Sequence, residues 1–333
     1  MTAPTAARGN AVPLRNRKGV RAWTGTVSRH RNLALFLVLA AVWGSAFMAI
    51  KAGLEFFPPV LFAAIRYDVA GVIMLAYAAV VVDDPIPRTR GEWTLVALGA
   101  TLLIAAYHAF LFVGETDPNV TSAVAAVLVS LSPVLTTVFA RAFLPSERLT
   151  LIGTVGLLIG LGGVVVLSQP DPGNLLGQGT GAKLLVFLAA ASFALGSVLT
   201  GTVDADLPIE TMEAWSMILG AALMHLLAVG LGESVADIVW TWEAVASLAY
   251  LSIAASALGF LIYFDLLDRL GPIEINLVSY VAPVFAALSG WLFLGEVIAV
   301  PTVVGFVLIF GGFLLVKREA IRQEWSRYLA SRS

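Results

Sequence analysis

Residues 271–316 read GPIEINLVSYVAPVFAALSGWLFLGEVIAVPTVVGFVLIFGGFLLV. They hold two apolar spans joined by a short acidic turn at Glu296. Residues 130–166 read SLSPVLTTVFARAFLPSERLTLIGTVGLLIGLGGVVV, with Glu147 in the place of Glu296. A proline, a Phe-Leu pair, a glutamate and a Gly-Gly pair recur in the same order. The chain therefore contains the same apolar hairpin twice.

The composition is that of a membrane protein. Of the 333 residues, 59% are hydrophobic and 13% are charged, and the mean hydropathy is +0.90. A soluble domain carries about 25% charged residues. The chain has no cysteine, which excludes disulfides, thiol chemistry and cysteine-ligated metals.

Ten apolar spans follow a basic N-terminal region. In a bilayer, a span satisfies its backbone polar groups either as a helix or within a closed barrel. These spans are too long and too uniformly apolar for barrel strands. The sequence therefore predicts an all-α integral membrane protein with ten transmembrane helices. We place them near residues 33–52, 60–82, 93–114, 119–140, 149–167, 182–201, 211–230, 244–265, 273–294 and 300–316.

The positive charges of the loops predict the orientation. If the N-terminus is cytoplasmic, 17 of the 20 Lys and Arg residues fall on the cytoplasmic side, as the positive-inside rule requires. Both termini are then cytoplasmic, which fits an even number of spans. We expect a multi-pass protein of the cell (plasma) membrane, with a disordered basic tail at residues 1–32 and a cytoplasmic C-terminal tail at residues 318–333. The first span is too long for the core of a cleavable signal peptide.

The duplication extends over most of the chain. At an offset of 149 residues the two halves align across five spans, and the aligned pairs include Trp43 with Ser192, Pro59 with Pro208, and Gly71 with Gly220. The halves cover residues 33–168 and 180–317 and hold five spans each. Because five is odd, the second half enters the membrane in the opposite sense. The sequence predicts two inverted five-helix repeats, an arrangement typical of secondary transporters.

Several short motifs carry a resemblance to a known family. They are Trp43-Gly44-Ser45-Ala46-Phe47, Ala64-Ile65-Arg66-Tyr67, Leu270-Gly271-Pro272, Ala282-Pro283-Val284, Leu294-Gly295-Glu296 and Gly311-Gly312. Through their order, spacing and duplication, the chain resembles the EamA-type proteins of the drug/metabolite transporter superfamily over about residues 33–317. The first repeat departs from the pattern, because it reads Leu-Pro-Ser-Glu up to Glu147 where the family has Leu-Gly-Glu.

This resemblance implies a compact ten-helix bundle with a central cavity between the repeats. It implies that spans 1, 3, 4, 6, 8 and 9 line the cavity and that spans 5 and 10 lie at the periphery, where relatives form dimer contacts. It implies export of amino acids, small metabolites or some drugs.

Polar residues within the spans are the candidates for a substrate site. A charge such as Arg66 costs roughly 2.5–3.5 kcal/mol at a helix centre, so it faces the interior. It contacts a substrate carboxylate or a gate, or it is a structural tie to another span. Asp68 lies about 200° around the helix and is a poor partner for it. His108, beside Tyr107, is a proton relay, a substrate contact or a hydrogen-bonded interior histidine.

Spans 9 and 4 offer polar groups at corresponding depths. Asn276 and Tyr280 are four residues apart and share a helix face. Pro283 frees a backbone carbonyl one turn earlier. In span 4, Ser130 and Pro133 occupy the matching positions. These groups line the cavity or pack within the bundle.

Spans 1 and 8 offer aromatic groups. Trp43, Ser45 and Phe47 wall the cavity or simply pack, and Tyr263 forms a cytoplasmic gate or reaches towards the interface. The full set of expected cavity or gate residues is Trp43, Ser45, Phe47, Arg66, Tyr107, His108, Ser130, Pro133, Tyr263, Asn276, Tyr280 and Pro283.

Glu147 and Glu296 have a structural interpretation, since an acid just before a helix complements the positive N-terminus of that helix. They precede spans 5 and 10. Gly156 and Gly160 form a GxxxG pattern that allows close approach of helices, either inside the bundle or in a homodimer.

The sequence favours a secondary active exporter of small metabolites, such as amino acids, that works by alternating access. A multidrug or sugar/nucleotide-type carrier, a channel and an intramembrane enzyme are the alternatives. The chain lacks Gly-x-Gly-Asp, Gly-x-Ser-Gly, His-x-x-x-His and Walker A patterns, so we expect no enzyme, no catalytic residues, no cofactor and no metal. The expected partners are the lipid bilayer, a small-molecule substrate and, in a homodimer, a second copy. No folded basic face points to nucleic acid.

Overall fold

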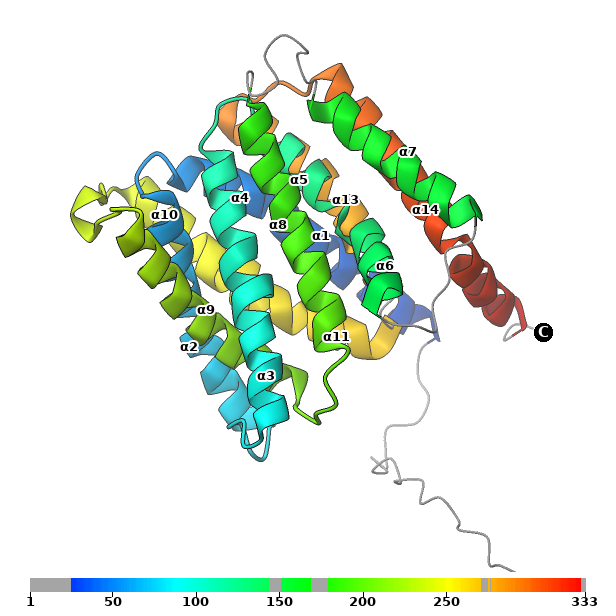
Figure 1. Ribbon diagram of the computed structural model, residues 1–333, viewed down its shortest axis with the longest axis horizontal. Helices are drawn as coiled ribbons and strands as arrows, with labels where there is room; N and C mark the ends of the chain where they lie inside the picture. Colours follow the sequence, from blue (N-terminus) through cyan, green and yellow to red (C-terminus); the bar gives the residue numbers. More distant parts are fainter. Residues whose placement is uncertain (1–24, 144–150, 169–178, 271–274, 276, 331–333) are drawn as a thin grey trace, which may run out of the picture.

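The computed structural model describes residues 25–143, 151–168, 179–270, 275 and 277–330. In this part of the chain the regular structure is helical, without strands. Seven helices are long and apolar enough to cross a membrane, and three shorter apolar helices bring the spans to ten. The all-α fold with ten transmembrane helices is confirmed (Figure 1).

The first repeat contains spans 1 to 5. Its helices are α1 (Gly25–Gly53), α2 (Pro59–Val81), α3 (Arg90–Leu98), η1 (Gly99–Ala106), α4 (Tyr107–Glu115), α5 (Ser122–Val129), α6 (Ser132–Phe143) and α7 (Leu151–Ser168). Here α3, η1 and α4 form span 3, and α5 and α6 form span 4. Helix α1 begins within the tail predicted to be disordered. Residues 26–32 contain neither Pro nor Gly, so the helix of span 1 extends backwards through them.

The second repeat contains spans 6 to 10. Its helices are α8 (Thr180–Thr200), α9 (Ile209–Gly230), the short η2 (Val235–Asp237), α10 (Trp242–Ala249), η3 (Tyr250–Leu258), α11 (Gly259–Leu270), α13 (Val278–Leu294) and α14 (Val300–Ala330). Here α10, η3 and α11 form span 8. Helix α14 continues beyond the last apolar residues, so the predicted C-terminal tail is helical as far as Ala330.

Local sequence signals explain where many helices begin. Pro59 occupies the first position of α2, where its missing N–H is not needed. Thr89 accepts a bond from the backbone of Glu92 and completes a capping box for α3. Thr121 and Thr241 cap α5 and α10 in the same way through their hydroxyls.

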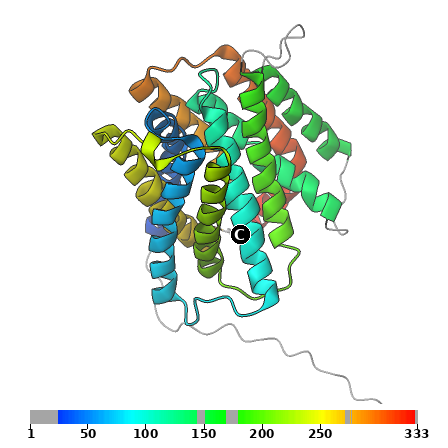
Figure 2. The same ribbon diagram turned by 60° about the vertical axis from the view of Figure 1, so that its left-hand side comes forward.

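The packing of the helices shows the inverted duplication. Span 2 packs on span 7 through α2 and α9, and span 5 packs on span 10 through α7 and α14. Exchange of the two repeats maps each of these pairs onto itself. Span 1 packs on span 9 through α1 and α13, and its counterpart is the packing of α8 on α5 and α6. The pair α7 and α14 lies at the edge of the molecule in both ribbon views (Figures 1 and 2).

Spans 3 and 8 share a local distortion. Each contains a π-helical segment, η1 and η3, at nearly equivalent positions of the two repeats. Such segments leave backbone carbonyls without their usual helical partner. Trp43 Nε1 donates to Ala255 O in η3 at 3.1 Å, and Ser192 Oγ donates to Leu102 O in η1 at 2.9 Å. Trp43 and Ser192 are repeat equivalents, so in each repeat the side chain at this position donates to a carbonyl of a π-helical segment.

Glycines bring α7 and α14 into close contact. A Cβ at Gly163 would lie 2.7 Å from Gly305 O, and a Cβ at Gly312 would lie 2.5 Å from Gly156 O. Gly162 and Gly311, the other members of the two Gly-Gly pairs, have nothing within 4 Å of such an atom among the described residues. The GxxxG glycines therefore pack one span on another within the chain.

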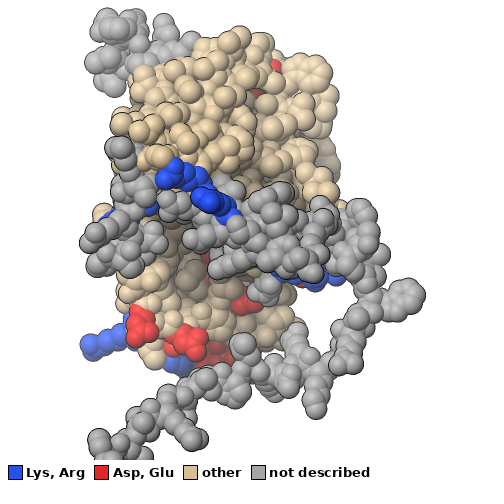
Figure 3. All heavy atoms as spheres, turned by 90° about the vertical axis from the view of Figure 1, so that its right-hand side faces the viewer, with Lys and Arg blue, Asp and Glu red and all other residues tan. Residues whose placement is uncertain are grey.

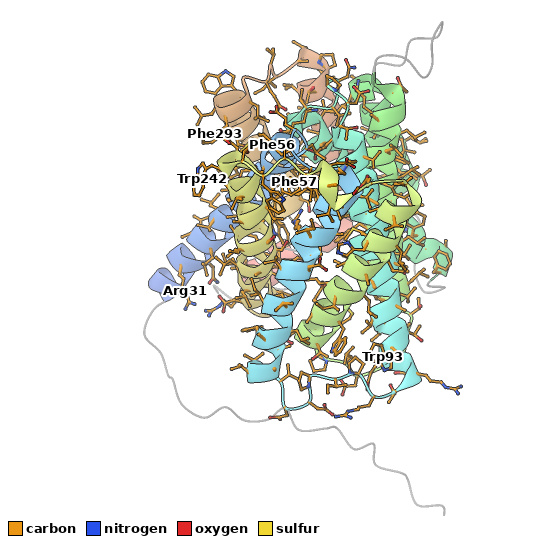
Figure 4. All side chains as sticks on the ribbon, turned by 90° about the vertical axis from the view of Figure 1, so that its left-hand side faces the viewer. Arg31, Phe56, Phe57, Trp93, Trp242 and Phe293 are labelled. Atoms are coloured by element: carbon orange, nitrogen blue, oxygen red, sulfur yellow. The ribbon has the colours of Figure 1, made fainter. Side chains whose placement is uncertain are left out.

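Exposed aromatic side chains mark the two ends of the bundle. Trp242 and Phe293 lie at one end (Figure 4), and both are more than half exposed, as are Trp240 and Trp291. Trp93 lies at the other end, well separated from Trp242 and Phe293 (Figure 4). Belts of this kind sit at the two interfaces between membrane and water.

The glycine contact yields a matched pair of substitutions. Gly312→Ala places a methyl group against the backbone of α7, and we expect it to destabilise the protein by about 1–3 kcal/mol. Gly311→Ala, one residue away, meets open space and leaves stability within about 0.5 kcal/mol. Thermal unfolding of both variants in detergent measures the difference. Equal unfolding temperatures would contradict the close contact of α7 and α14.

Candidate functional site

Arg66 on α2 is a buried charge near the middle of the bundle, 6% exposed. Its Nε donates to Ser256 Oγ on η3 at 3.1 Å. Its guanidinium carbon lies 5.1 Å from the ring centre of Tyr67 and 6.0 Å from that of Phe112. No carboxylate of the described residues lies within ion-pair distance of it. The guanidinium group of Arg66 is thus held by one hydroxyl and two aromatic rings. Because no described carboxylate neutralises its positive charge, it can bind an anion.

His108 on α4 belongs to the same group of residues. Its Nε2 is hydrogen-bonded to Tyr67 Oη at 2.7 Å, and its Nδ1 lies 2.8 Å from Ile104 O. The carbonyl is an acceptor only, so Nδ1 carries the proton and Nε2 accepts the hydrogen bond from Tyr67. Tyr107 packs edge-on against His108. The structure therefore brings together three predicted residues, Arg66, Tyr107 and His108, and Tyr67 joins them.

Glu213 on α9 is a site residue that sequence reasoning missed. It is half-buried near the start of α9. Its carboxylate interacts electrostatically with Tyr67 and with Tyr263 on α11. An acid inside an apolar span is the signal that could have revealed it. With Arg66, it gives the interior one acidic and one basic group.

Asp68 turns away from Arg66, as the helix geometry predicts. Its Oδ2 lies 2.7 Å from His225 Nε2 on α9. The two side chains are 49% and 39% exposed, so the pair lies towards the surface of the α2–α9 contact. It ties the two repeats together outside the Arg66 group.

A second group of predicted residues joins spans 1 and 8. Trp43 packs edge-to-face on Phe260 and at a tilt on Tyr263, with ring centres 5.8 and 5.5 Å apart. Ser45 Oγ is hydrogen-bonded to Tyr250 Oη at 2.6 Å. The charge of Glu213 acts through space on Tyr67 of one group and on Tyr263 of the other.

Other predicted residues lie within the packing of the bundle. Phe47 is 7% exposed and belongs to the main apolar core. Span 4 breaks between α5 and α6, and Ser130 at this break donates to Val127 O in its own helix at 2.6 Å. Pro133 is the second residue of α6 and is half-buried. These three residues are not in the Arg66 group.

Span 9 differs most from the expectation. Pro283 is buried inside α13. The ring of Tyr280 packs against Phe310 and Phe313 of the peripheral helix α14, with ring centres 5.3 and 4.4 Å apart. Tyr280 therefore faces span 10 and is not beside Arg66. The orientation of α13 directs this ring towards α14, where it is buried. Asn276 lies outside the described residues.

One end of the bundle is tightly closed. We call it the outer end, following the predicted orientation. Glu233 caps α2 by accepting from Val60 N at 3.2 Å and Leu61 N at 2.7 Å, and Val239 N donates to Phe56 O at 2.9 Å. The side chains of Phe56 and Phe57 lie at this end, near that of Trp242 (Figure 4). These contacts join the first repeat to the second.

Glu296 also closes the outer end, in a way that corrects the prediction. Its carboxylate accepts from Ser122 N at 3.0 Å and from Ser122 Oγ at 3.1 Å, so it caps α5 of the other repeat and not α14. Gly295 makes this possible because it adopts a left-handed conformation with φ of 66°. A Cβ at Gly290 would overlap with the carboxylate. Glu147, its counterpart, lies outside the described residues.

At the opposite, inner end the contacts fall into two groups. Trp215 Nε1 donates to Pro85 O at 2.8 Å and its ring packs on Trp93, which ties α9 to α2 and α3. Asp265 on α11 pairs with Arg269 at 2.7 Å and with Arg31 on α1 at 3.7 Å. Figure 3 views the face where α14 ends and shows charged side chains gathered in a band across its middle and at its lower end, with a recessed surface between them.

These features define a class of protein: a multi-pass membrane protein with two inverted repeats and polar groups enclosed between them. The sequence profile of the EamA-like transporter family matches residues 31–169 and again residues 180–318. The chain belongs to this family, and it is a membrane transporter of the drug/metabolite transporter superfamily.

Individual relatives agree with this assignment. The chain is 30% identical over 257 residues to an uncharacterized inner membrane transporter, YedA, of Escherichia coli K12, covering 77% of this chain and 80% of the relative. It is 26% identical to an uncharacterized transporter of Archaeoglobus fulgidus, covering 83% and 95%. A WAT1-related chloroplastic protein of Arabidopsis thaliana is 27% identical, covering 82% and 66%. A solved crystal structure with 24% identity superposes with a TM-score of 0.60 over 89% of this chain and 99% of that chain, which shows the shared fold.

The bond between Tyr67 and His108 makes a stability prediction. Tyr67→Phe removes the donor and leaves a buried ring nitrogen without a partner, which costs about 1–3 kcal/mol. Tyr77→Phe on the same helix is the control, since its ring packs only at the edge of the core. Thermal unfolding is the measurement, and an unfolding temperature for Tyr67→Phe equal to that of the control would contradict the role of the bond.

Proposed function

We propose that this transporter is a secondary active exporter of small metabolites such as amino acids, and that it works by alternating access through the space between its two repeats. Both termini lie in the cytoplasm, and the protein resides in the cell membrane. The excess of Lys and Arg in the corresponding loops supports the orientation. The inner-membrane name of the relative from Escherichia coli supports the location.

Equivalent residues of the two repeats differ in how deeply they are buried, and this asymmetry is the main support for the proposal. Ile104 in span 3 is 2% exposed and packs on Gly220 of span 7. Its repeat equivalent, Ile253 in span 8, is 46% exposed. Ala221 is likewise buried, whereas its equivalent Val72 is 61% exposed. Span 3 thus packs more extensively on span 7 than span 8 packs on span 2, where contacts such as the bond from Arg66 to Ser256 remain.

Two repeats of similar sequence that pack differently support two states of the transporter. If the repeats exchange their packing, span 8 closes on span 2 and span 3 moves away from span 7. The closed outer end then opens and the inner end closes. Alternation of this kind moves a substrate across the membrane without a continuous pore.

The charged groups of the interior support a zwitterionic substrate. Arg66 has no carboxylate partner among the described residues and is suited to a substrate carboxylate. Glu213 is half-buried and near enough to Tyr67 for its charge to act on it through space, and its carboxylate is suited to an amino group. Aromatic rings belong to the same two groups, since Tyr107 packs on His108 and Trp43 packs on Tyr263. An amino acid supplies all three complementary features.

Counterflow into proteoliposomes tests the proposal. Vesicles preloaded with an unlabelled amino acid should accelerate uptake of the same labelled amino acid, because a carrier exchanges substrate across the membrane. A multidrug or sugar/nucleotide-type carrier would show counterflow only with those compounds. Flux that neither saturates nor responds to preloading would indicate a channel and contradict the carrier mechanism.

Arg66→Leu should raise the KM for amino-acid exchange by roughly 10–100-fold, since a lost charged hydrogen bond costs about 1.5–3 kcal/mol. Arg88→Leu is the matched control, because Arg88 lies exposed in the loop between α2 and α3 and pairs with Asp84. Exchange kinetics of both variants in proteoliposomes give the comparison. An unchanged KM for Arg66→Leu, with normal expression, would contradict substrate binding by Arg66.

A further inference from the structure

Glu115, the last residue of α4, is a buried acid in the outer end that the proposed transport site does not use. Its side chain is fully buried, and among the described residues neither carboxylate oxygen has a hydrogen-bond partner. An ionised carboxylate in such a setting is costly, and a buried group of this kind takes up a proton instead. An ionised Glu115 would therefore need a positively charged neighbour to stabilise it.

Lys51 on α1 is a neighbouring cation, but its ammonium group already donates hydrogen bonds to other groups. It donates to the backbone carbonyls of Glu115, Asp117 and Val120, at 2.9, 2.7 and 2.8 Å. An ammonium group has three N–H donors, so these bonds use all of them. Lys51 therefore attracts the Glu115 side chain only through space.

The other charged neighbours do not pair with Glu115 either. Glu296, which follows α13, repels it and uses its own carboxylate to cap α5 through Ser122. Lys183 on α8 is buried and faces Asp117. Arg66 on α2 acts only at longer range.

The charges of this cluster balance when Glu115 is neutral. Lys51 and Lys183 are then matched by Asp117 and Glu296, and every one of these groups has a partner as described above. Ionisation of Glu115 would add a fully buried negative charge without a hydrogen-bond partner among the described residues. On its own helix, His108 is bonded to Tyr67 and lies two turns away.

We propose that Glu115 binds a proton when the outer end is closed and releases it to the outside solution when that end opens. The proton comes from water on that side and returns to it. The proposal rests on the alternating-access function proposed above. Because the closed state holds one more proton, acid conditions favour closure, and the ratio of closed to open states changes by at most about tenfold per pH unit.

Infrared spectroscopy tests the protonation directly and needs no substrate. A protonated carboxylic acid has a carbonyl stretching band that a carboxylate lacks. We expect the spectrum of the full-length protein at neutral pH to lose part of this band in Glu115→Gln. The control Glu55→Gln removes an exposed acid at the same end and leaves the band unchanged. A band that is the same in Glu115→Gln and in the parent protein would overturn the proposal.

Thiol labelling tests the link to closure. The chain has no cysteine, so a single introduced cysteine is labelled specifically. Val120→Cys places the thiol in the closed outer end, and Thr116→Cys places it on the exposed surface nearby. The rate at Val120→Cys divided by the rate at Thr116→Cys cancels the intrinsic effect of pH on thiols. We expect this ratio to rise severalfold as the pH is raised through the neutral range.

In the Glu115→Gln background the ratio should stay low and independent of pH, since the amide imitates the protonated acid. A ratio that does not change with pH in the Glu115 protein would overturn the proposal, even if Glu115→Gln fails to fold. Neither measurement requires transport. Failure of amino-acid counterflow with an intact infrared and labelling result would therefore count against the proposed function alone.

Discussion

The bilayer supplies no hydrogen-bond partners, and the rest of the structure follows from that constraint. Each span is a helix because only a helix satisfies its own backbone there. Where the helix is distorted, as in η1 and η3, side chains such as Ser192 and Trp43 bond to the freed carbonyls. Polar side chains obey the same rule, since Ser130 bonds within its own helix and Asp68 bonds to His225 across the repeats. Among the described residues, few buried polar groups lack a hydrogen-bond partner. These few groups are the ones that point to function.

Contacts between the repeats have two kinds of chemistry. Glycines and apolar side chains form the contacts that run along the spans, as at Gly163 and Gly312 between α7 and α14. Carboxylates capping helices form the contacts at the outer end, as Glu233 does for α2 and Glu296 for α5. Caps of this kind break and form with little change in the helices themselves. This division suits a molecule in which the repeats stay intact and their ends separate.

The sequence predicted the spans, the inverted repeat and the helical fold, because hydropathy and parity depend only on composition and order. Two of the expected cavity residues, Arg66 and His108, are buried and both contact Tyr67, since a buried charge and a mid-span histidine both need polar or aromatic surroundings. The sequence did not predict the position of Tyr280, because spacing gives a shared face but not the neighbour that the face meets. The sequence analysis did not single out Glu213 and Glu115, because hydropathy alone does not distinguish an acid that packs inside the bundle from one that meets solvent. Which acid reaches inward depends on helix packing.

Alternating access requires the two repeats to exchange their packing. The most direct measurement is the distance between spin labels at Val72 and Ile253, which are exposed in the structure and whose repeat equivalents, Ala221 and Ile104, are buried. Cysteines introduced at both positions of this cysteine-free chain carry the labels. We expect two populations of this distance. The shorter one should increase when substrate or pH shifts the protein to the state that is open at the outer end, because span 8 then closes on span 2. A single distance that no substrate and no pH changes would contradict this exchange of packing.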